Sequence, residues 1–362
     1  MQQVWIEKRG GPDTLRVRHA DDPRPGPGQV RVRVEAAGVN FADLMMRMGI
    51  YPDAPQLPAV PGYEVAGRVD AVGPGAPGEL EGADVAALCR FGGYSESICI
   101  PAGQVWRRPP GVNAAVAAAL PVNYLTAYQM LEVMAPPAPG EHVLIHSAAG
   151  GVGQAALQLA RRRGALVLAS ASPGKHDFLR DQGVAHVLDS RRRNFAGVVR
   201  AIADGRGVDV ALEARHGRWI MESYRCLAPC GRLVLFGFAS AARTPTSGML
   251  SALRTLAEVP WLRLNPLRLM NENRSVAGVN LGRLWGEGPL LAGWMHRLLA
   301  LLQAGEIAPR IDRVYPFAAA ADAHRRLHER RNVGKVLLAP DPAALAAAAH
   351  LPDEVVHRHG AA

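Results

Sequence analysis

The glycine-rich segment at residues 147–156 restricts the possible folds of this chain more than any other feature. It follows the short apolar run Val143-Leu-Ile145 and precedes a helix expected from Gln154 onward. It contains a G-x-G-x-x-A sequence, which fits the pattern G-x-G-x-x-G/A in the strand–turn–helix setting that this pattern requires. Glycines let such a turn approach a pyrophosphate, and the next helix offers unpaired N–H groups and a positive dipole end. The segment therefore predicts a dinucleotide site formed by Gly150, Gly151, Val152 and Gly153.

The hydrophobic rhythm of the chain changes near residue 121. From there to residue 282, short apolar runs alternate with helical patterns, which indicates a parallel, doubly wound sheet buried on both faces. Residues 1–120 instead show period-two runs separated by Gly and Pro, typical of a mostly antiparallel, partly barrel-like β domain. Residues 283–340 are expected to rejoin that domain, and residues 341–362 to form a tail. Besides 143–145, the expected strands of the parallel sheet are 166–168, 185–188, 208–212, 232–236 and 275–279.

Composition excludes several classes of protein. With 362 residues, 49% hydrophobic and 20% charged, the chain is long and apolar enough for a large ordered core. Its net charge of +9 comes almost wholly from scattered arginines, which favours anionic ligands over nucleic acid. Because neither a signal peptide nor an apolar run of membrane-spanning length is apparent, we expect a cytoplasmic enzyme. The four cysteines predict no disulfide framework, and Cys226 and Cys230 are expected to be buried.

The residues after the second expected parallel strand favour NADPH over NADH. An acidic residue there would bind the free ribose hydroxyls, whereas a cation accommodates a 2′-phosphate. This chain has Ser172 and Lys175 at that place, with no carboxylate before Asp177. The alternative is that Lys175 only begins a helix, where a cation is unfavourable beside the positive end of the dipole.

Several motifs resemble those of one family. They are Val39-Asn-Phe-Ala-Asp-Leu44, Gly49-Ile-Tyr-Pro52, Val60-Pro-Gly-Tyr-Glu-Val-Ala-Gly67, Ala148-Ala-Gly-Gly-Val-Gly153 and Asn332-Val-Gly-Lys335. In these motifs and their order, the chain resembles the zinc-free quinone oxidoreductase (zeta-crystallin-like) group of the medium-chain dehydrogenase/reductase superfamily. The first and last motifs are similar to the vesicle amine transport protein branch. The resemblance implies an α/β fold: a Rossmann NADPH-binding domain over 121–282 and a GroES-like catalytic domain over 1–120 and 283–340.

The resemblance also implies that no metal is bound. Zinc-dependent members place a cysteine and a Gly-His-Glu sequence where this chain has Asn40 and Gly62-Tyr-Glu64. Two of the usual three zinc ligands are therefore missing. His324 and His328 lie four residues apart and are expected to share one helix face instead of binding a metal.

Residue roles follow from the same resemblance. Tyr51 is the first candidate for a hydrogen-bond donor or proton source, Asn40 is expected to orient the substrate, and the alternative is that Tyr51 only packs in its loop. Lys335 is expected near the cofactor, or else as a solvated lysine on an edge strand. The remaining expected substrate contacts are Asp43, Tyr63, Phe238 and Asn280, and the remaining cofactor contacts are Thr126, Ser190, Phe236, Gly237 and Asn332.

Two segments depart from the family pattern. After the fourth expected strand, where relatives have an acidic residue followed by a glycine pair, this chain has Glu213-Ala-Arg-His-Gly217. A cofactor contact or the loop path is expected to differ there. Ser190 stands where many quinone reductases have a tyrosine near the 2′-phosphate, and one of the arginines at 191–193 is expected to assist.

These features together predict a zinc-free, NADPH-dependent oxidoreductase that reduces quinones or α,β-unsaturated carbonyl compounds, and a homodimer. An enoyl-thioester reductase is the nearest enzymatic alternative, although such enzymes carry a lysine and an aspartate where this chain has Phe238 and Asn280. A membrane-associated, weakly catalytic or non-catalytic NADPH-binding protein is the alternative of another class. It rests on the apolar and basic segment 244–274, which is more often a cleft cap or a subunit interface.

Overall fold

The chain folds into two compact units. The computed structural model describes residues 1–189, 191–192, 194–215, 217–237 and 265–357. Unit 1 comprises residues 1–125 and 283–362, and unit 2 comprises residues 126–282. These boundaries lie within five residues of those expected from the change of hydrophobic rhythm, and the C-terminal tail is part of unit 1.

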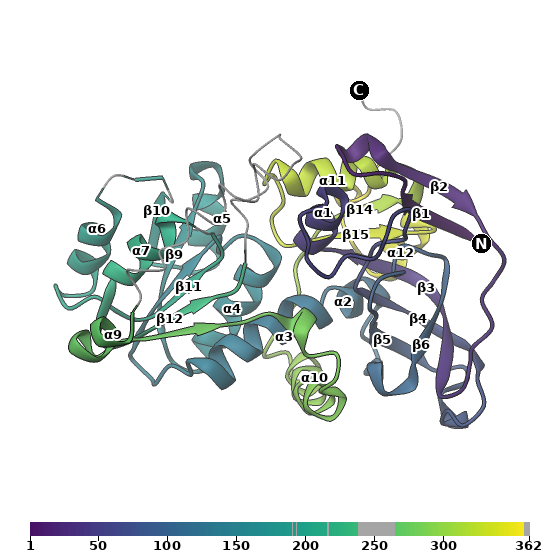
Figure 1. The fold of residues 1–362 in the computed structure, drawn as a ribbon, viewed down its shortest axis with the longest axis horizontal. Coiled ribbons are helices and arrows are strands. Elements are labelled where there is room, and N and C mark those ends of the chain that lie inside the picture. Colours follow the sequence, from purple (N-terminus) through teal and green to yellow (C-terminus); the bar gives the residue numbers. More distant parts are fainter. Residues whose placement is uncertain (190, 193, 216, 238–264, 358–362) are drawn as a thin grey trace. The chain divides into compact units, whose positions relative to one another are not determined.

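Unit 2 is built on a six-stranded sheet with the order β10-β9-β8-β11-β12-β13, and every neighbouring pair is parallel. Figure 1 labels four of these strands, β9 to β12. The strand order is the 3-2-1-4-5-6 order of doubly wound dinucleotide-binding sheets, in which the direction of winding reverses between the first and fourth strands. All six expected strands are therefore confirmed. The strands are β8 (His142–His146), β9 (Leu166–Ala171), β10 (His186–Asp189), β11 (Val208–Glu213), β12 (Leu227–Leu235) and β13 (Ser275–Gly278).

Helices follow the strands of unit 2 and cover the sheet. β8 passes through the glycine-rich segment into α4 (Gly151–Arg162), and β9 passes through a short 3-10 turn (Pro173–Lys175) into α5 (His176–Asp181). The remaining helices are α6 (Phe195–Ile202), α7 (Arg218–Arg225) and α9 (Pro266–Glu272). Leu144, Leu168 and Leu233 from the sheet pack with Phe195 and Tyr224 in one buried core.

Unit 1 contains a seven-stranded, mostly antiparallel sheet, with β14-β15-β3-β4-β5-β7 in order and β6 also paired to β3. β1 and β2 form a separate antiparallel pair. The predicted antiparallel domain is confirmed, and β14–β15 is its parallel pair. The strands are β1 (Gln2–Ile6), β2 (Leu15–His19), β3 (Gln29–Val39), β4 (Glu64–Val72), β5 (Asp84–Leu88), β6 (Ser97–Pro101), β7 (Val105–Arg107), β14 (Ile311–Pro316) and β15 (Lys335–Ala339).

Helices complete unit 1. They are α1 (Phe41–Met48), α2 (Ala114–Ala118), α10 (Gly288–Gln303), α11 (Ala320–His328) and α12 (Pro342–Ala348), while α3 (Pro121–Tyr128) crosses the boundary of the two units. His324 and His328 both lie on α11, as expected. None of the helices in the described part of the chain combines the length and the apolar character needed to cross a membrane.

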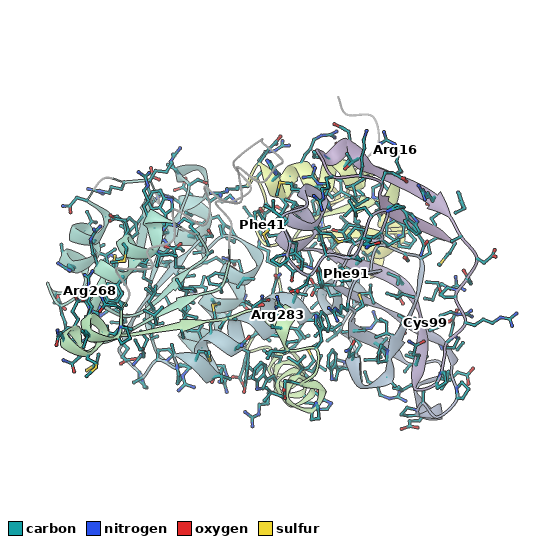
Figure 2. The ribbon with its side chains drawn as sticks, viewed as in Figure 1. Arg16, Phe41, Phe91, Cys99, Arg268 and Arg283 are labelled. Atoms are coloured by element: carbon teal, nitrogen blue, oxygen red, sulfur yellow. The ribbon has the colours of Figure 1, made fainter. Side chains whose placement is uncertain are left out.

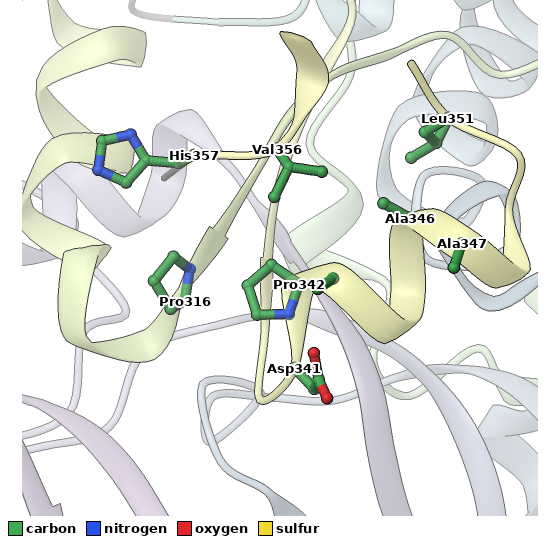
Figure 3. A pocket seen from close by; sticks show the side chains of 9 residues that line it. Pro316, Asp341, Pro342, Ala346, Ala347, Leu351, Val356 and His357 are labelled. Carbon is green, nitrogen blue, oxygen red and sulfur yellow. The ribbon is translucent and has the colours of Figure 1, made fainter. Parts of the chain in front are cut away.

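The C-terminal segment of unit 1 forms a pocket of about 380 Å³ against β14 and α12 (Figure 3). Small and apolar side chains dominate its lining, including Pro316, Ala346 and Val356. The imidazole of His357 packs against Tyr315 and lies 3.7 Å from Asp322, so structural contacts already occupy it. The lining of this pocket therefore provides few groups that could bind a ligand or react with it.

One expectation about the cysteines is wrong. Cys226 is buried, but Cys230 is exposed and has a left-handed backbone with φ of 63°. The apolar strand pattern begins with Leu227, yet β12 is irregular between its pairings at residues 227 and 232, and this irregularity carries Cys230 to the surface.

Candidate functional site

A buried ionic cluster in unit 1, formed by Asn40, Glu64 and Lys335, is assembled by three adjacent strands. The β15–β3 register pairs Val336 with Val39, which brings Lys335 opposite Asn40 at the end of β3. The β3–β4 register likewise brings Glu64 opposite Gly38. Gly38 is required there, because a Cβ atom would lie 2.4 Å from the Glu64 carboxylate. This Lys335 cluster therefore depends on sheet register and one missing side chain.

Within the Lys335 cluster every polar side chain has a partner. The Lys335 ammonium donates to the carboxylate of Glu64 and, at 2.6 Å, to Oδ1 of Asn40. The Asn40 amide nitrogen donates to the same carboxylate at 2.9 Å. Lys335 is only 3% exposed and β15 lies between β14 and β3, so the alternative of a solvated lysine on an edge strand is wrong. The ammonium holds the amide of Asn40 in one orientation.

Asp43 lies beside this cluster and is completely buried. Its carboxylate accepts hydrogen bonds from the backbone N–H groups of Asn40 and Gly62 and from the Tyr94 hydroxyl. Burial raises the pKa of Asp43 to about 7, against the opposing effect of these donors. All three contacts are internal and tie the start of α1 to the loop before β4. They give Asp43 a scaffolding role, and its expected contact with substrate remains a prediction.

An aromatic group adjoins the same part of unit 1. The ring of Tyr63 contacts the rings of Tyr51, Phe91 and Trp285 at centroid distances of 6.1, 5.2 and 6.4 Å. Phe91, labelled in Figure 2, has φ of 70°, an unusual conformation for a bulky residue. Burial raises the pKa values of the Tyr51 and Tyr63 hydroxyls, so both phenols stay protonated. This group brings a protonated donor, Tyr51, next to flat apolar surfaces.

The glycine-rich segment of unit 2 fits the diphosphate of a dinucleotide. α4 begins at Gly151, and its N-cap, Gly150, supplies no side chain to accept from the first-turn N–H groups. A bound anion can take that place. At Gly153 a Cβ atom would lie 2.4 Å from the carbonyl oxygen of Ser147, so the tight turn needs glycine. The turn lies at the carboxyl end of β8, next to the point where the winding of the sheet reverses.

The end of β9 carries the residues expected to select the cofactor. β9 ends at Ala171, and Ser172 and Lys175 follow it directly, with Ser172 exposed and Lys175 half-buried. Asp189 ends the neighbouring β10, and it accepts hydrogen bonds from the backbone and side chain of Arg191. Ser190 and Arg193, also expected to assist phosphate recognition, lie outside the described residues.

A second buried network lies at the carboxyl edge of the parallel sheet. It consists of His146, Ser170, Glu213, Arg215 and Ser223 and is called here the Arg215 network. The register places Ser170 of β9 beside His146 of β8, and one step beyond the Leu212–Ile145 pair it places Glu213 of β11 on the other side. Nε and Nη2 of Arg215 each donate to Glu213 at 2.8 Å.

The other predicted site residues occupy separate places. Thr126 is buried in α3, and Asn332 is buried with its amide donating to the Gly334 carbonyl at 3.0 Å. Phe236 and Gly237 directly follow β12, and the backbone N–H of Phe236 donates to the Glu213 carbonyl. The side-chain Oδ1 of Asn280 accepts from the backbone N–H of Gly282. Phe238 lies outside the described residues.

The sequence motifs include Glu64 without indicating its role, and the roles of His146 and Ser223 were not predicted. A usable signal existed for His146, because it is a polar residue at the end of an apolar parallel strand, as Glu213 is. Ser223 lies in a helix with no such signal. Among the residues that the structure describes, no group of three or more His, Cys, Asp or Glu side chains is arranged to hold a metal ion.

Fold and site geometry define a two-unit dehydrogenase, and the family comparisons agree. Residues 26–110 match the alcohol dehydrogenase GroES-like domain, and residues 182–338 match the zinc-binding dehydrogenase family. The chain is 41% identical over 338 residues to the rat synaptic vesicle membrane protein VAT-1 homolog, covering 92% of this chain and 82% of that protein. The chain therefore belongs to the medium-chain dehydrogenase/reductase superfamily of oxidoreductases, and the resemblance read from its motifs is confirmed.

Solved structures give the same result. A mycobacterial protein solved in complex with NADPH is 32% identical with a TM-score of 0.83, covering 94% of this chain and all of that one. A quinone oxidoreductase of Pseudomonas syringae is 30% identical with a TM-score of 0.81, covering 94% and 99% of the two chains. The CurK enoyl reductase is 30% identical with a TM-score of 0.78, covering 93% and 98%.

Proposed function

We propose that this protein is a zinc-independent, NADPH-dependent oxidoreductase that transfers hydride to quinones or α,β-unsaturated carbonyl compounds. One observation carries the proposal. A helix whose N-cap is glycine begins at the winding reversal of a parallel sheet, and Ser172 and Lys175 follow the next strand where an NAD-dependent enzyme would have a carboxylate. The likeness to a protein solved with NADPH supports the choice of cofactor.

In this proposal, NADPH supplies the hydride, and unit 1 supplies hydrogen bonding to the acceptor. Reduction of a conjugated carbonyl places negative charge on its oxygen, and a fixed donor stabilises that charge. Because burial raises the pKa of Tyr51, its phenol is a poorer acid than in water and remains a donor throughout the neutral range. We therefore assign Tyr51 as the hydrogen-bond donor. The proton that completes the reaction would then come from elsewhere, such as water.

The hydrogen bonds of Asn40 fix the orientation of its side chain, and this limits what the side chain can do. Its amide nitrogen donates to Glu64 and to the Gly38 carbonyl, and its amide oxygen accepts from Lys335, so the amide has one fixed orientation. We propose that Asn40 orients the substrate by van der Waals contact with this fixed amide and that Lys335 is a positioning residue acting through it. The aromatic group around Tyr63 favours flat, apolar acceptors.

The test is an assay of NADPH oxidation with a naphthoquinone, an enone and a crotonyl thioester as separate acceptors. We expect turnover of quinone or enone and little with the thioester. Preferred turnover of the thioester would replace this proposal with the enoyl reductase alternative, which the likeness to CurK favours. No oxidation with any acceptor would contradict both.

Cofactor choice is tested separately by binding. The Lys175→Ala variant is expected to bind NADPH about tenfold more weakly, with little change for NADH, because only NADPH carries the 2′-phosphate. Lys8→Ala is the matched control, since Lys8 is an exposed lysine of unit 1. Wild-type protein that binds NADH tightly and is indifferent to NADPH would refute the assignment.

A membrane-associated role is the second candidate, favoured by one specific observation. On α9, Leu267 and Met270 are 72% and 71% exposed, within the segment 244–274 that suggested membrane contact. Residues 238–264 lie outside the described residues. Flotation with anionic liposomes tests this role: recovery of wild type but not of a Leu267→Ser/Met270→Ser variant would support it. Absence of wild type from the floating fraction would exclude it.

A further inference from the structure

The Arg215 network contains more buried polar and charged side chains than are needed to connect β11 with α7. Glu213 is completely buried and accepts from the backbone N–H and the guanidinium of Arg215, and from the Ser223 hydroxyl. Buried ion pairs are seldom a more stable solution than apolar packing of similar volume. An ionic network in this position is therefore better explained by a need for a charge in a fixed place.

Hydrogen bonding fixes the charge state of the network. Because Ser223 donates to Glu213, its oxygen accepts from Nε2 of His146 at 2.9 Å. The other ring nitrogen then accepts from Ser170 at 3.0 Å. Burial lowers the pKa of His146 to about 3, so the imidazole stays neutral. Arg215 is the network's cation, and Glu213 is its anion.

The same contacts leave Arg215 little freedom. Nη2 lies 2.9 and 3.1 Å from the two ring nitrogens of His146, and therefore against the face of that ring. The guanidinium carbon is also 4.4 Å from the centre of the Trp219 ring. With the Glu213 carboxylate in a forked pair, these contacts preorganise the guanidinium, so little side-chain entropy remains to be lost on binding an anion.

Arg215 lies at the edge of the sheet where the cofactor is expected to bind. Arg215 lies two residues beyond the end of β11, and His146, which it contacts, directly precedes the turn 147–153. β8 and β11 are the two strands between which the winding of the sheet reverses. Ligands of such sheets bind outside the carboxyl ends of the strands at this reversal.

We propose that Arg215 is a cofactor-binding residue whose guanidinium, oriented by Glu213 and His146, pairs with the diphosphate of the dinucleotide. It adds a side-chain cation to the backbone N–H groups at the start of α4. Glu213, His146 and Ser223 are positioning residues for it. This inference rests on the proposed function, because it takes the dinucleotide as the ligand of unit 2.

Arg218 provides a matched control. Its guanidinium carbon is 4.6 Å from the centre of the same Trp219 ring, but Arg218 is exposed and is not part of the network. NADPH binding is measured by titration calorimetry, with no turnover required. We expect Arg215→Gln to raise the Kd of NADPH at least tenfold and Arg218→Gln to change it less than twofold. Equal effects of the two variants would overturn the proposal, because they would reflect net charge alone.

A fragment of the cofactor locates the contact. Adenosine 2′-monophosphate carries the 2′-phosphate but no diphosphate. We expect Arg215→Gln to bind it as wild type does, and Lys175→Ala to bind it several-fold more weakly. If Arg215→Gln weakens binding of this fragment as much as that of NADPH, the assignment to the diphosphate is wrong.

Folding of the variants is checked by thermal melting. If Arg215→Gln does not fold, Arg215→Lys replaces it, since lysine keeps the charge but loses the forked geometry. A Kd for NADPH raised at least threefold in Arg215→Lys supports the proposal, and an unchanged Kd overturns it. Wild-type protein that binds neither NADPH nor NADH would instead overturn the proposed function itself.

Discussion

The two buried networks each hold a buried glutamate beside a cation, but the cation is a lysine in one and an arginine in the other. Each contains a glutamate without solvent exposure that pairs with a cation: Lys335 with Glu64 in unit 1, and Arg215 with Glu213 in unit 2. The lysine cluster joins residues up to 295 positions apart, whereas the Arg215 network spans at most 77. A lysine ammonium is a compact charge that fits a closed site, whereas a planar guanidinium can also stack on an aromatic ring. Lys335 therefore serves the assembly of unit 1, whereas Arg215 is the cation proposed to bind a ligand.

The largest expected effect is on the stability of unit 1. Lys335→Met leaves the Glu64 carboxylate buried without its cation, which should lower the free energy of unfolding by about 3–5 kcal/mol. Urea unfolding followed by circular dichroism measures this. Arg225→Gln, which breaks an exposed pair with Glu222, is the control and should change stability by less than about 1 kcal/mol. Similar values for both variants would show that the Lys335 cluster contributes no more than a surface pair.

Asp43 should make unit 1 less stable as pH rises. Its pKa is about 7 in the folded protein against 3.8 as the ordinary value, so the folded state binds the proton more tightly. The stabilisation is complete below about pH 4 and is lost as pH rises through about 7, by an amount on the order of a few kcal/mol. The measurement is the unfolding free energy of wild type minus that of Asp43→Asn between pH 4 and 8. A difference that grows with pH would contradict the raised pKa.

His146 should give unit 2 the opposite response. Its pKa falls from 6.5 to about 3 on folding, through burial first and the nearby Arg215 charge as well, while Glu213 opposes the shift. The unfolded chain therefore binds more protons between pH 3 and 6.5, so stability should rise with pH across that window and then level off. Comparing wild type with His146→Gln at pH 4.5 and 7 checks this. If the two proteins lose stability equally on acidification, His146 is not neutral and buried as described.

The smallest expected effect concerns the turn that adjoins the Arg215 network. In Gly153→Ala the new methyl group would lie 2.4 Å from the Ser147 carbonyl, so the backbone of the turn must move. We expect NADPH to bind about tenfold more weakly, a loss of roughly 1.4 kcal/mol. Gly103→Ala, where no atom lies within 4 Å of the added methyl group, should leave binding unchanged. Unaltered affinity in Gly153→Ala would mean that the turn does not contact the cofactor.

Local patterns made much of unit 2 predictable. A buried parallel strand is a short apolar run, so the six strands could be located from such runs in the sequence. The turn at Gly150–Gly153 was predicted because its glycines lie between a strand and a helix. The position of Ser172 and Lys175 after β9 followed in the same way. Cys230 was misplaced because an irregularity within a strand leaves no periodic signal.

The sequence by itself determined the order of strands and helices, the family and the glycine-rich turn proposed to bind phosphate, because each depends on residues close together along the chain. Tertiary structure alone decided that Lys335 is a buried partner of Asn40 and Glu64, since that contact requires β15 to pair with β3 in one register. It also decided that Arg215 meets His146, which lies 69 residues before it in the chain. Strand pairing over long separations sets which charges meet in the interior, and the periodicity of a single segment does not record it.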